Sequence, residues 1–165
     1  MRPSLPTVDE VEALPRLLHI RIPAEWQDVN GHVNIQHYMH MYDAAGYPWY
    51  ETLGATREYI RTSHWGMFDL EHHLWYLREL HVGDEVTLHC RLIDRTQKRF
   101  HGVMFLVNRS RSELASAMEF VSTGANLQAR SSAAIPDPIA AAMDAQIEKN
   151  AALDWAAPVC GVMAP

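Results

Sequence analysis

The stretch Trp26-Gln27-Asp28-Val29-Asn30-Gly31-His32-Val33-Asn34 separates two different hydrophobic patterns in the sequence. On its N-terminal side, Leu18, Ile20 and Ile22 alternate with polar residues, which is typical of a strand with one buried face. On its C-terminal side, from about Gln36, apolar residues recur every three or four positions, which is typical of one face of a helix. The polar stretch is therefore predicted to be a loop that joins a strand to a long helix.

The long helix has recognisable signals at both of its ends. Asn34 is a suitable N-cap, and Gly54 is a suitable residue just beyond the C-terminus. Pro48 lacks a backbone donor inside the helix, so we expect a break or bend near residues 46–48. The apolar positions of the helix are Tyr38, Tyr42, Ala45, Trp49 and Leu53.

After a short helix at about 56–62, the sequence predicts four antiparallel strands. The first covers about 68–76, and strict alternation places its even-numbered residues on one face and its odd-numbered residues on the other. The other three cover about 86–92, 100–107 and 114–123. The predicted order is therefore a strand, one long helix and four antiparallel strands.

A single helix covers only one face of a five-stranded sheet, so the other face or an edge needs cover from elsewhere. A second copy of the chain is the simplest cover, so we expect a homodimer or homotetramer. Residues 128–165 are rich in Ala and Pro, and we expect one weak helix at about 138–150 followed by a loose tail.

The chain has 165 residues, 48% of them hydrophobic and 21% charged, with a formal net charge of −6. This composition supports a buried core, and the negative charge argues against non-specific binding to nucleic acid. The sequence lacks the apolar run of a secretory signal and the run of ~20 apolar residues that would span a bilayer. Cys90 and Cys160 form no metal-binding or disulfide pattern, so we expect a protein of the reducing cytoplasm.

The polar loop carries the chemistry that the sequence predicts. A carboxylate beside a helix N-terminus, such as Asp28, is favoured in its ionised form and can act as a nucleophile or as a general base on water. Backbone N–H groups near residues 34–36 can stabilise an oxyanion, and residues 65–68 from a second copy offer another source. The alternative is that Asp28 and Asn34 only shape a turn and cap the helix.

The loop and the helix after it resemble the hot-dog-fold acyl-CoA thioesterases of the 4-hydroxybenzoyl-CoA thioesterase type. The family signature is an Asp three residues before a Gly, then His-Val-Asn, then a Tyr on the long helix. The likeness continues through residues 71–80 and 82–84, and it covers about 18–127. The positions that match the signature are Asp28, Gly31, His32, Val33, Asn34 and Tyr38.

The resemblance implies an α+β hot-dog fold, in which an antiparallel five-stranded sheet wraps around one long helix. The domain would occupy residues 1–130, and 131–165 would be a C-terminal extension. The implied reaction is hydrolysis of an acyl-CoA to a carboxylic acid and CoA, with no cofactor beyond the CoA of the substrate. No HxH or HExxH motif is present, so no metal is expected.

The resemblance also assigns site residues. Residues 71–79 are similar to thioesterases associated with carnitine and betaine breakdown, which implies a short, polar or cationic acyl group. Trp26 stands where the family often has a second Asp, and Ile35 where it often has a polar residue. The expected catalytic residues are Asp28, His32 and Asn34. The expected substrate-binding residues are Trp26, Gly31, Tyr38, Trp65, Gly66, Glu71 and His73. The expected CoA-binding residues are Arg95, Lys98 and Arg99.

Two other functions remain open at this point. A hot-dog hydratase or dehydratase acting on an enoyl thioester would use a His with a carboxylate, and His73 with Glu71 would fit that role. A non-catalytic acyl-CoA binding module would bind CoA esters without turnover. Products formed from saturated and enoyl-CoA substrates distinguish the three.

Overall fold

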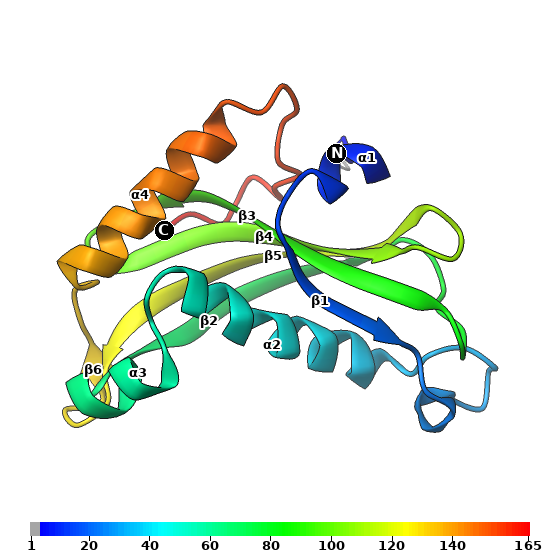
Figure 1. The fold of residues 1–165 in the computed structure, drawn as a ribbon, viewed down its shortest axis with the longest axis horizontal. Coiled ribbons are helices and arrows are strands. Elements are labelled where there is room, and N and C mark those ends of the chain that lie inside the picture. The colour runs from blue at the N-terminus through cyan, green and yellow to red at the C-terminus, as the bar shows by residue number, and fades with distance from the viewer. Residues whose placement is uncertain (1–3) are drawn as a thin grey trace.

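The computed structural model describes residues 4–165. It contains one long helix, several shorter helices and an antiparallel sheet (Figure 1). The elements in chain order are α1 (Val8–Glu12), β1 (Arg16–Arg21), the 3-10 helix η1 (Ala24–Trp26), α2 (Ile35–Thr52), α3 (Arg57–Ser63), β2 (Trp65–Tyr76), β3 (Glu85–Arg95), β4 (Arg99–Asn108), β5 (Glu113–Asn126), β6 (Ser131–Ser132) and α4 (Asp137–Ala151).

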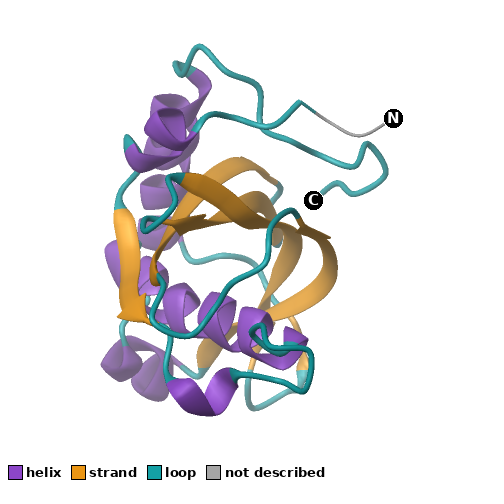
Figure 2. Ribbon diagram, turned by 90° about the vertical axis from the view of Figure 1, so that its right-hand side faces the viewer, coloured by secondary structure: helices purple, strands orange, loops and turns teal. Residues whose placement is uncertain are grey.

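The five long strands form one sheet in the order β1-β3-β4-β5-β2, and every neighbouring pair is antiparallel. The two-residue β6 adds a short pairing to β5. The sheet is strongly curved (Figure 2), and α2 lies along one of its faces. This arrangement confirms the expected α+β hot-dog fold, and it leaves β2 at an edge of the sheet. No helix among residues 4–165 has the length and apolar character needed to cross a bilayer.

The ends of α2 are set by local residues, as predicted. The Asn34 side chain accepts a hydrogen bond from Gln36 N at 3.1 Å. Gly54 has a φ of +86°, a backbone conformation that favours glycine. Of the break or bend expected near 46–48, the break is wrong, because α2 continues through Pro48 to Thr52. Trp49, which follows the proline and is only 2% exposed, anchors the last turn in the core.

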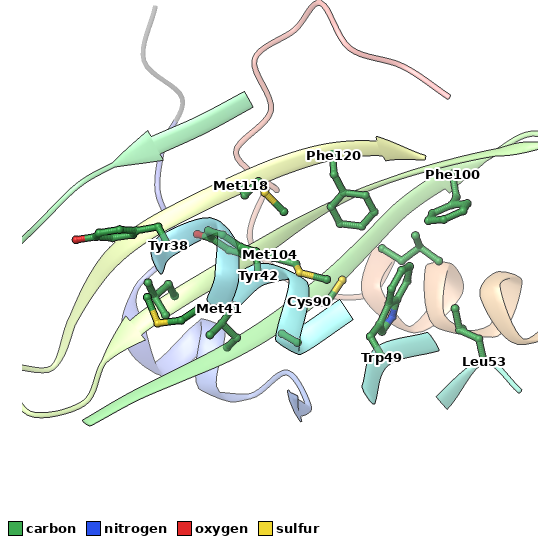
Figure 3. Close-up of a cluster of buried hydrophobic side chains, with 14 of the residues drawn as sticks. Tyr38, Met41, Tyr42, Trp49, Leu53, Cys90, Phe100, Met104, Met118 and Phe120 are labelled. Atoms are coloured by element: carbon green, nitrogen blue, oxygen red, sulfur yellow. The ribbon is translucent and has the colours of Figure 1, made fainter. Parts of the chain in front are cut away.

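The core lies between α2 and the sheet. Side chains from the buried face of α2 point toward side chains from the middle strands, as Figure 3 shows. Trp49 packs against Phe100 and Phe120, with ring centroids 5.8 and 5.7 Å apart. The Tyr42 hydroxyl and Ser116 Oγ form a buried hydrogen bond of 2.7 Å. All five positions predicted for the apolar face of the helix are buried.

A β-bulge changes the face assignment of β2. Asp69 pairs with Ser122 and Glu71 pairs with Val121, so Leu70 is an extra residue without a partner on β5. The strict alternation expected from the sequence is therefore wrong across this point. Before the bulge the odd-numbered residues face α2, and after it the even-numbered residues do, beginning with His72.

The outer face of the middle strands is covered by the chain itself rather than left for a second copy. Helix α1 and the segment after α4 pack on it, and α4 lies along the half of β3 that β1 does not pair (Figure 1). The weak helix expected near 138–150 is confirmed as α4, whereas the expected loose tail is wrong. Trp155 packs edge-on against Phe105 at 5.8 Å, and Met163 is only 7% exposed.

Two buried charged side chains hold this C-terminal segment. Arg91 is 8% exposed and donates hydrogen bonds to the Trp155 and Asn150 carbonyl oxygens at 2.6 and 3.0 Å. Glu119 is fully buried, and its carboxylate lies 2.8 Å from His101 Nε2 and accepts from Cys160 N at 2.7 Å. Backbone groups of the segment therefore satisfy charges that the sheet would otherwise bury unpaired.

Candidate active site

The loop before α2 is a tight structure closed by its own backbone. Asp28 N donates to the His32 carbonyl at 2.9 Å, and Gly31 N donates to the Asp28 carbonyl at 3.1 Å. Gly31 has a φ of +88°, which explains a glycine at this position of the motif. Val33 N donates to the Leu80 carbonyl at 2.8 Å, which fixes the loop to the segment that follows β2.

The Asp28 carboxylate is held within the loop by Asn30 and His32. Its Oδ1 accepts from Asn30 N at 2.8 Å, and its Oδ2 lies 3.3 Å from Asn30 Nδ2 and 3.5 Å from His32 Nδ1. Desolvation raises the pKa of Asp28, but the hydrogen bonds from Asn30 and the nearby His32 together outweigh it, so the pKa lies below the usual aspartate value. The carboxylate is therefore ionised at neutral pH.

Asn34 and Tyr38 make structural contacts at the start of α2. Asn34 uses its side-chain oxygen to cap α2 and its backbone N–H to reach the Trp26 carbonyl at 2.9 Å. The Tyr38 ring meets the edge of Tyr76 at 5.1 Å, and its hydroxyl donates to the Arg78 carbonyl at 3.4 Å. Together these contacts fix the first turns of α2 against the end of β2.

A shallow pocket of about 250 Å³ adjoins the loop. It brings His32 and Tyr38 together with the start of α2 and the end of β2. Asp28 is not in its lining, but the Asp28 carboxylate lies 3.5 Å from Nδ1 of the lining residue His32. Its lining residues are His32, Val33, Ile35, Tyr38, Tyr76, Leu77, Arg78 and Glu79.

A larger groove of about 530 Å³ runs between α2 and β2. On α2 its lining extends from Gln36 in the first turn to Tyr50 near the C-terminal end of the helix. Sequence reasoning did not assign this groove. On α2, its lining residues are three or four positions apart, a spacing that can be recognised in the sequence. On β2, its lining residues are Asp69 and His72, and they share a face only because of the bulge. Its lining residues are Gln36, Met39, His40, Tyr42, Asp43, Gly46, Tyr47, Trp49, Tyr50, Asp69, His72, Met104, Met118 and Phe120.

The predicted aromatic wall is not assembled around Asp28 within one chain. Trp26 stacks on His37 with centroids 4.6 Å apart and lines a separate depression that includes Leu18. Trp65 is 6% exposed and donates from Nε1 to the Ala134 carbonyl at 3.0 Å. Trp65 and Gly66 lie at the start of β2, whereas the loop contacts the segment that follows the other end of this strand. The 11 residue steps from Trp65 to Tyr76 span about 36 Å, so these two residues do not line a wall around Asp28 of the same chain.

Glu71 and His73 also lie away from the loop. They face the outer side of β2 beyond the bulge, where the His73 ring packs against Trp75 at 4.3 Å. Glu71 and His73 line neither the groove nor the pocket that His32 lines, so the structure gives no support to a hydratase built on them.

The three basic residues expected to bind CoA lie at the turn between β3 and β4. Arg95 Nε donates to Asp144 Oδ1 of α4 at 2.6 Å, so this guanidinium already has an anionic partner. Lys98 and Arg99 are exposed. The turn lies at the Trp65 end of the sheet, away from Asp28 of the same chain. Within residues 4–165 there is no group of three or more His, Cys, Asp or Glu side chains placed to hold a metal ion.

The family model of the thioesterase-like superfamily matches residues 22–143. The chain belongs to this superfamily. The matched region of this thioesterase-like chain includes the Asp28 loop, α2 and all the long strands after it. Thioester hydrolysis is therefore the chemistry that the family supports for this site.

Two curated relatives have sequences similar to this thioesterase-like chain. Both are described as L-carnitine dehydrogenase/betainyl-CoA thioesterase, one from Rhizobium sp at 23% identity over 138 residues and one from Rhizobium meliloti (strain 1021) at 22% over 139 residues. Each match covers 84% of this chain but only 28% of the relative. The chain thus spans little more than a quarter of their length.

Solved structures share the fold. A Staphylococcus aureus protein in complex with CoA superposes with a TM-score of 0.79 at 23% identity, covering 87% of this chain and 90% of that one. A 1,4-dihydroxy-2-naphthoyl-CoA thioesterase from Synechocystis superposes with a TM-score of 0.68 at 15% identity, covering 77% and 93%. At these identities the likeness establishes the hot-dog fold.

Proposed function

We propose that this chain hydrolyses the thioester of an acyl-CoA, releasing the carboxylic acid and CoA, with Asp28 as the catalytic carboxylate. The observation that carries this proposal is the ionised Asp28 carboxylate in the loop before α2, held against His32, which lines an open pocket, in a member of the thioesterase-like superfamily. Hydrolysis consumes only water, so no further cofactor is proposed.

The start of α2 also offers an oxyanion donor. Gln36 N–H is taken by the Asn34 side chain and His37 N–H by the Asn34 carbonyl, whereas Ile35 N–H has no partner within residues 4–165. A free N–H at a helix N-terminus favours negative charge, so Ile35 N–H is placed to stabilise the oxyanion that forms at the thioester carbonyl.

Two routes use these groups. The Asp28 carboxylate attacks the carbonyl carbon, CoA leaves as the thiolate, and water then hydrolyses the mixed anhydride. Alternatively, Asp28 removes a proton from a water that attacks the carbonyl directly. His32, 3.5 Å from Asp28, orients the carboxylate in either route.

We further propose that the acyl group is short and polar or cationic. The pocket that His32 lines is small, and the curated relatives are named for a thioesterase that acts on betainyl-CoA. A cytoplasmic location is proposed with it, since the two cysteines are both unpaired.

We propose a homodimer formed by the β2 edges. β2 is 12 residues long, ends the sheet on one side and is mostly exposed. Antiparallel pairing of two such edges places the Trp65 end of one strand beside the Tyr76 end of the other. Residues from opposite ends of β2, and the β3–β4 turn with Lys98 and Arg99, would then serve one site.

The test is thiol release from a panel of acyl-CoA esters by wild type and Asp28→Asn. The variant keeps the size of the side chain and is expected to lower kcat by about two orders of magnitude or more. Asp137→Asn, an exposed carboxylate at the start of α4, is the matched control and is expected to retain wild-type kcat. Turnover by Asp28→Asn close to wild type would refute the mechanism.

A further inference from the structure

One short segment between β2 and β3, residues 80–84, holds both ends of the loop before α2. At the entrance to the loop, Ile22 N donates to the Asp84 carbonyl at 2.9 Å, and Gly83 N donates back to the Ile22 carbonyl at 2.9 Å. At its exit, Val33 N donates to the Leu80 carbonyl at 2.8 Å. Ile22 and Val33 are both only 2% exposed. The loop therefore begins and ends on the same short segment.

The exit contact depends on a single peptide group, the one that joins Leu80 to His81. Its carbonyl accepts from Val33 N, and its N–H donates to Asp84 Oδ2 at 2.9 Å. A peptide group is planar and rigid, so an acceptor that fixes its N–H also fixes the direction of its carbonyl. An anionic acceptor also polarises the group, which makes the carbonyl a stronger acceptor for Val33. The Asp84 carboxylate thus acts on the loop through one peptide group.

The Asp84 side chain belongs to a buried network. Asp84 is 8% exposed, and Asn108 Nδ2 donates at 2.8 Å to the same Oδ2 that accepts from His81 N. Arg111 Nη2 lies 3.7 Å from that oxygen and 2.8 Å from His81 Nδ1. Groups from three different segments of the chain therefore surround the carboxylate and fix its orientation.

Asn108 donates to this carboxylate while its own side-chain oxygen stays unpaired. The residue is fully buried, and its Oδ1 has no hydrogen-bond partner within residues 4–165. An unpaired buried acceptor costs free energy, but turning the amide over would place Oδ1 against Asp84 Oδ2, where two acceptors repel. The turn itself is closed by Asp84 N, which donates to the His81 carbonyl at 3.1 Å. The network therefore orients the Asp84 side chain beyond what the turn requires.

We propose that Asp84 is a positioning residue for the Asp28 carboxylate, acting through the peptide group between Leu80 and His81. The inference rests on the proposed thioesterase function and adds a residue that lies outside both the loop and the lining of the pocket that His32 lines. Loss of the Asp84 side chain should therefore displace the catalytic carboxylate without removing a substrate contact. Its effect is expected on kcat rather than on KM.

The experiment compares Asp84→Ala with Asp84→Asn. Thiol release from acetyl-CoA, butyryl-CoA, benzoyl-CoA and betainyl-CoA gives kcat and KM for the ester that wild type hydrolyses fastest. Asp84→Ala is expected to lower kcat about ten- to hundredfold and to leave KM within about twofold of wild type. Asp84→Asn keeps an acceptor for both hydrogen bonds, because both end on one oxygen, and is expected to keep kcat within about threefold of wild type.

A second measurement follows the loop without a substrate. Amide hydrogen exchange of Ile22 and Val33, followed by NMR, is expected to be at least tenfold faster in Asp84→Ala and close to wild type in Asp84→Asn. Asn108→Leu serves as a second variant if Asp84→Ala fails to fold. It removes one donor to Asp84 and the unpaired oxygen together, and it is expected to lower kcat about three- to tenfold.

Arg91→Met is the control for stability, because it weakens the hold on the C-terminal segment and leaves the segment 80–84 intact. It is expected to keep the wild-type kcat and the wild-type exchange at Ile22 and Val33. Unchanged exchange at these amides in Asp84→Ala, or a kcat for Asp84→Asn as low as that for Asp84→Ala, would overturn the inference. If wild type hydrolyses none of the esters, the thioesterase proposal fails, whereas the exchange rates still decide whether Asp84 holds the loop.

Discussion

Replacement of Arg91 by methionine tests how the C-terminal segment is held to the sheet. The change keeps most of the side-chain volume and removes the donors to the Trp155 and Asn150 carbonyls. It also removes the guanidinium that lies 4.1 Å from the Trp155 ring centroid. The segment would then lie on the outer face with two carbonyls deprived of their charged partner.

The magnitude follows from these contacts. Each hydrogen bond from a charged donor contributes about 1.5–3 kcal/mol, and the cation–π contact adds about 0.5–2 kcal/mol. Burial of the guanidinium offsets part of this gain, because the charge is removed from water. We therefore expect Arg91→Met to lower the free energy of unfolding by about 2–4 kcal/mol, which in a chain of this size lowers Tm by about 4–16 °C.

The assay is thermal unfolding followed by circular dichroism, with limited proteolysis to locate the weakened region. Arg61→Met is the matched control, because Arg61 forms an exposed ion pair with Glu58 on α3. Such a pair contributes less than about 1 kcal/mol. If the two variants unfold at the same temperature and the C-terminal segment stays equally resistant to protease, Arg91 does not hold it.

Three other measurements follow from the structure. Because the pKa of Asp28 is lowered and its ionised form reacts, kcat/KM should stay constant from neutral pH down to the usual aspartate range, near pH 4, and fall only below it; an acidic limb near pH 6 would contradict this. Gly102→Ala should reduce the unfolding free energy by about 1–3 kcal/mol in urea, because the added Cβ would lie 2.7 Å from the Phe120 ring, whereas Gly46→Ala, with open space around it, should not. Light scattering at micromolar concentration should give twice the chain mass, and a monomer would exclude pairing of β2 edges.

The parts of the fold that the sequence predicts depend on neighbouring residues. Asn34 and Gly54 define the two ends of α2 through interactions within a few positions of the chain, so the sequence predicts both ends. The prediction of a break at Pro48 failed because it considered only the helix hydrogen bond that proline removes. The burial of Trp49 against the sheet outweighs that loss of free energy. The polar loop was identified because its glycine and its carboxylate belong to one local turn.

The parts that the sequence did not predict depend on distant partners. The packed C-terminal segment relies on Arg91, which lies 64 residues before Trp155. The sequence predicts Trp65 to be a pocket residue, but its indole N–H donates to the carbonyl of Ala134, 69 positions away. The sequence of β2 alone does not indicate which residue lacks a partner on β5. The groove could therefore be identified only from the observed strand pairing.

The bulge at Leu70 has a consequence for aligning and editing this chain. Because Leu70 is the surplus residue of β2, removing it would leave a regular strand in which Asp69 and His72 still face α2. A deletion at most other positions of the strand would instead exchange the faces of every residue on one side of it. Alignments of relatives that are one residue shorter in this strand should therefore place the gap at position 70, because a deletion there keeps Asp69 and His72 on the face toward α2.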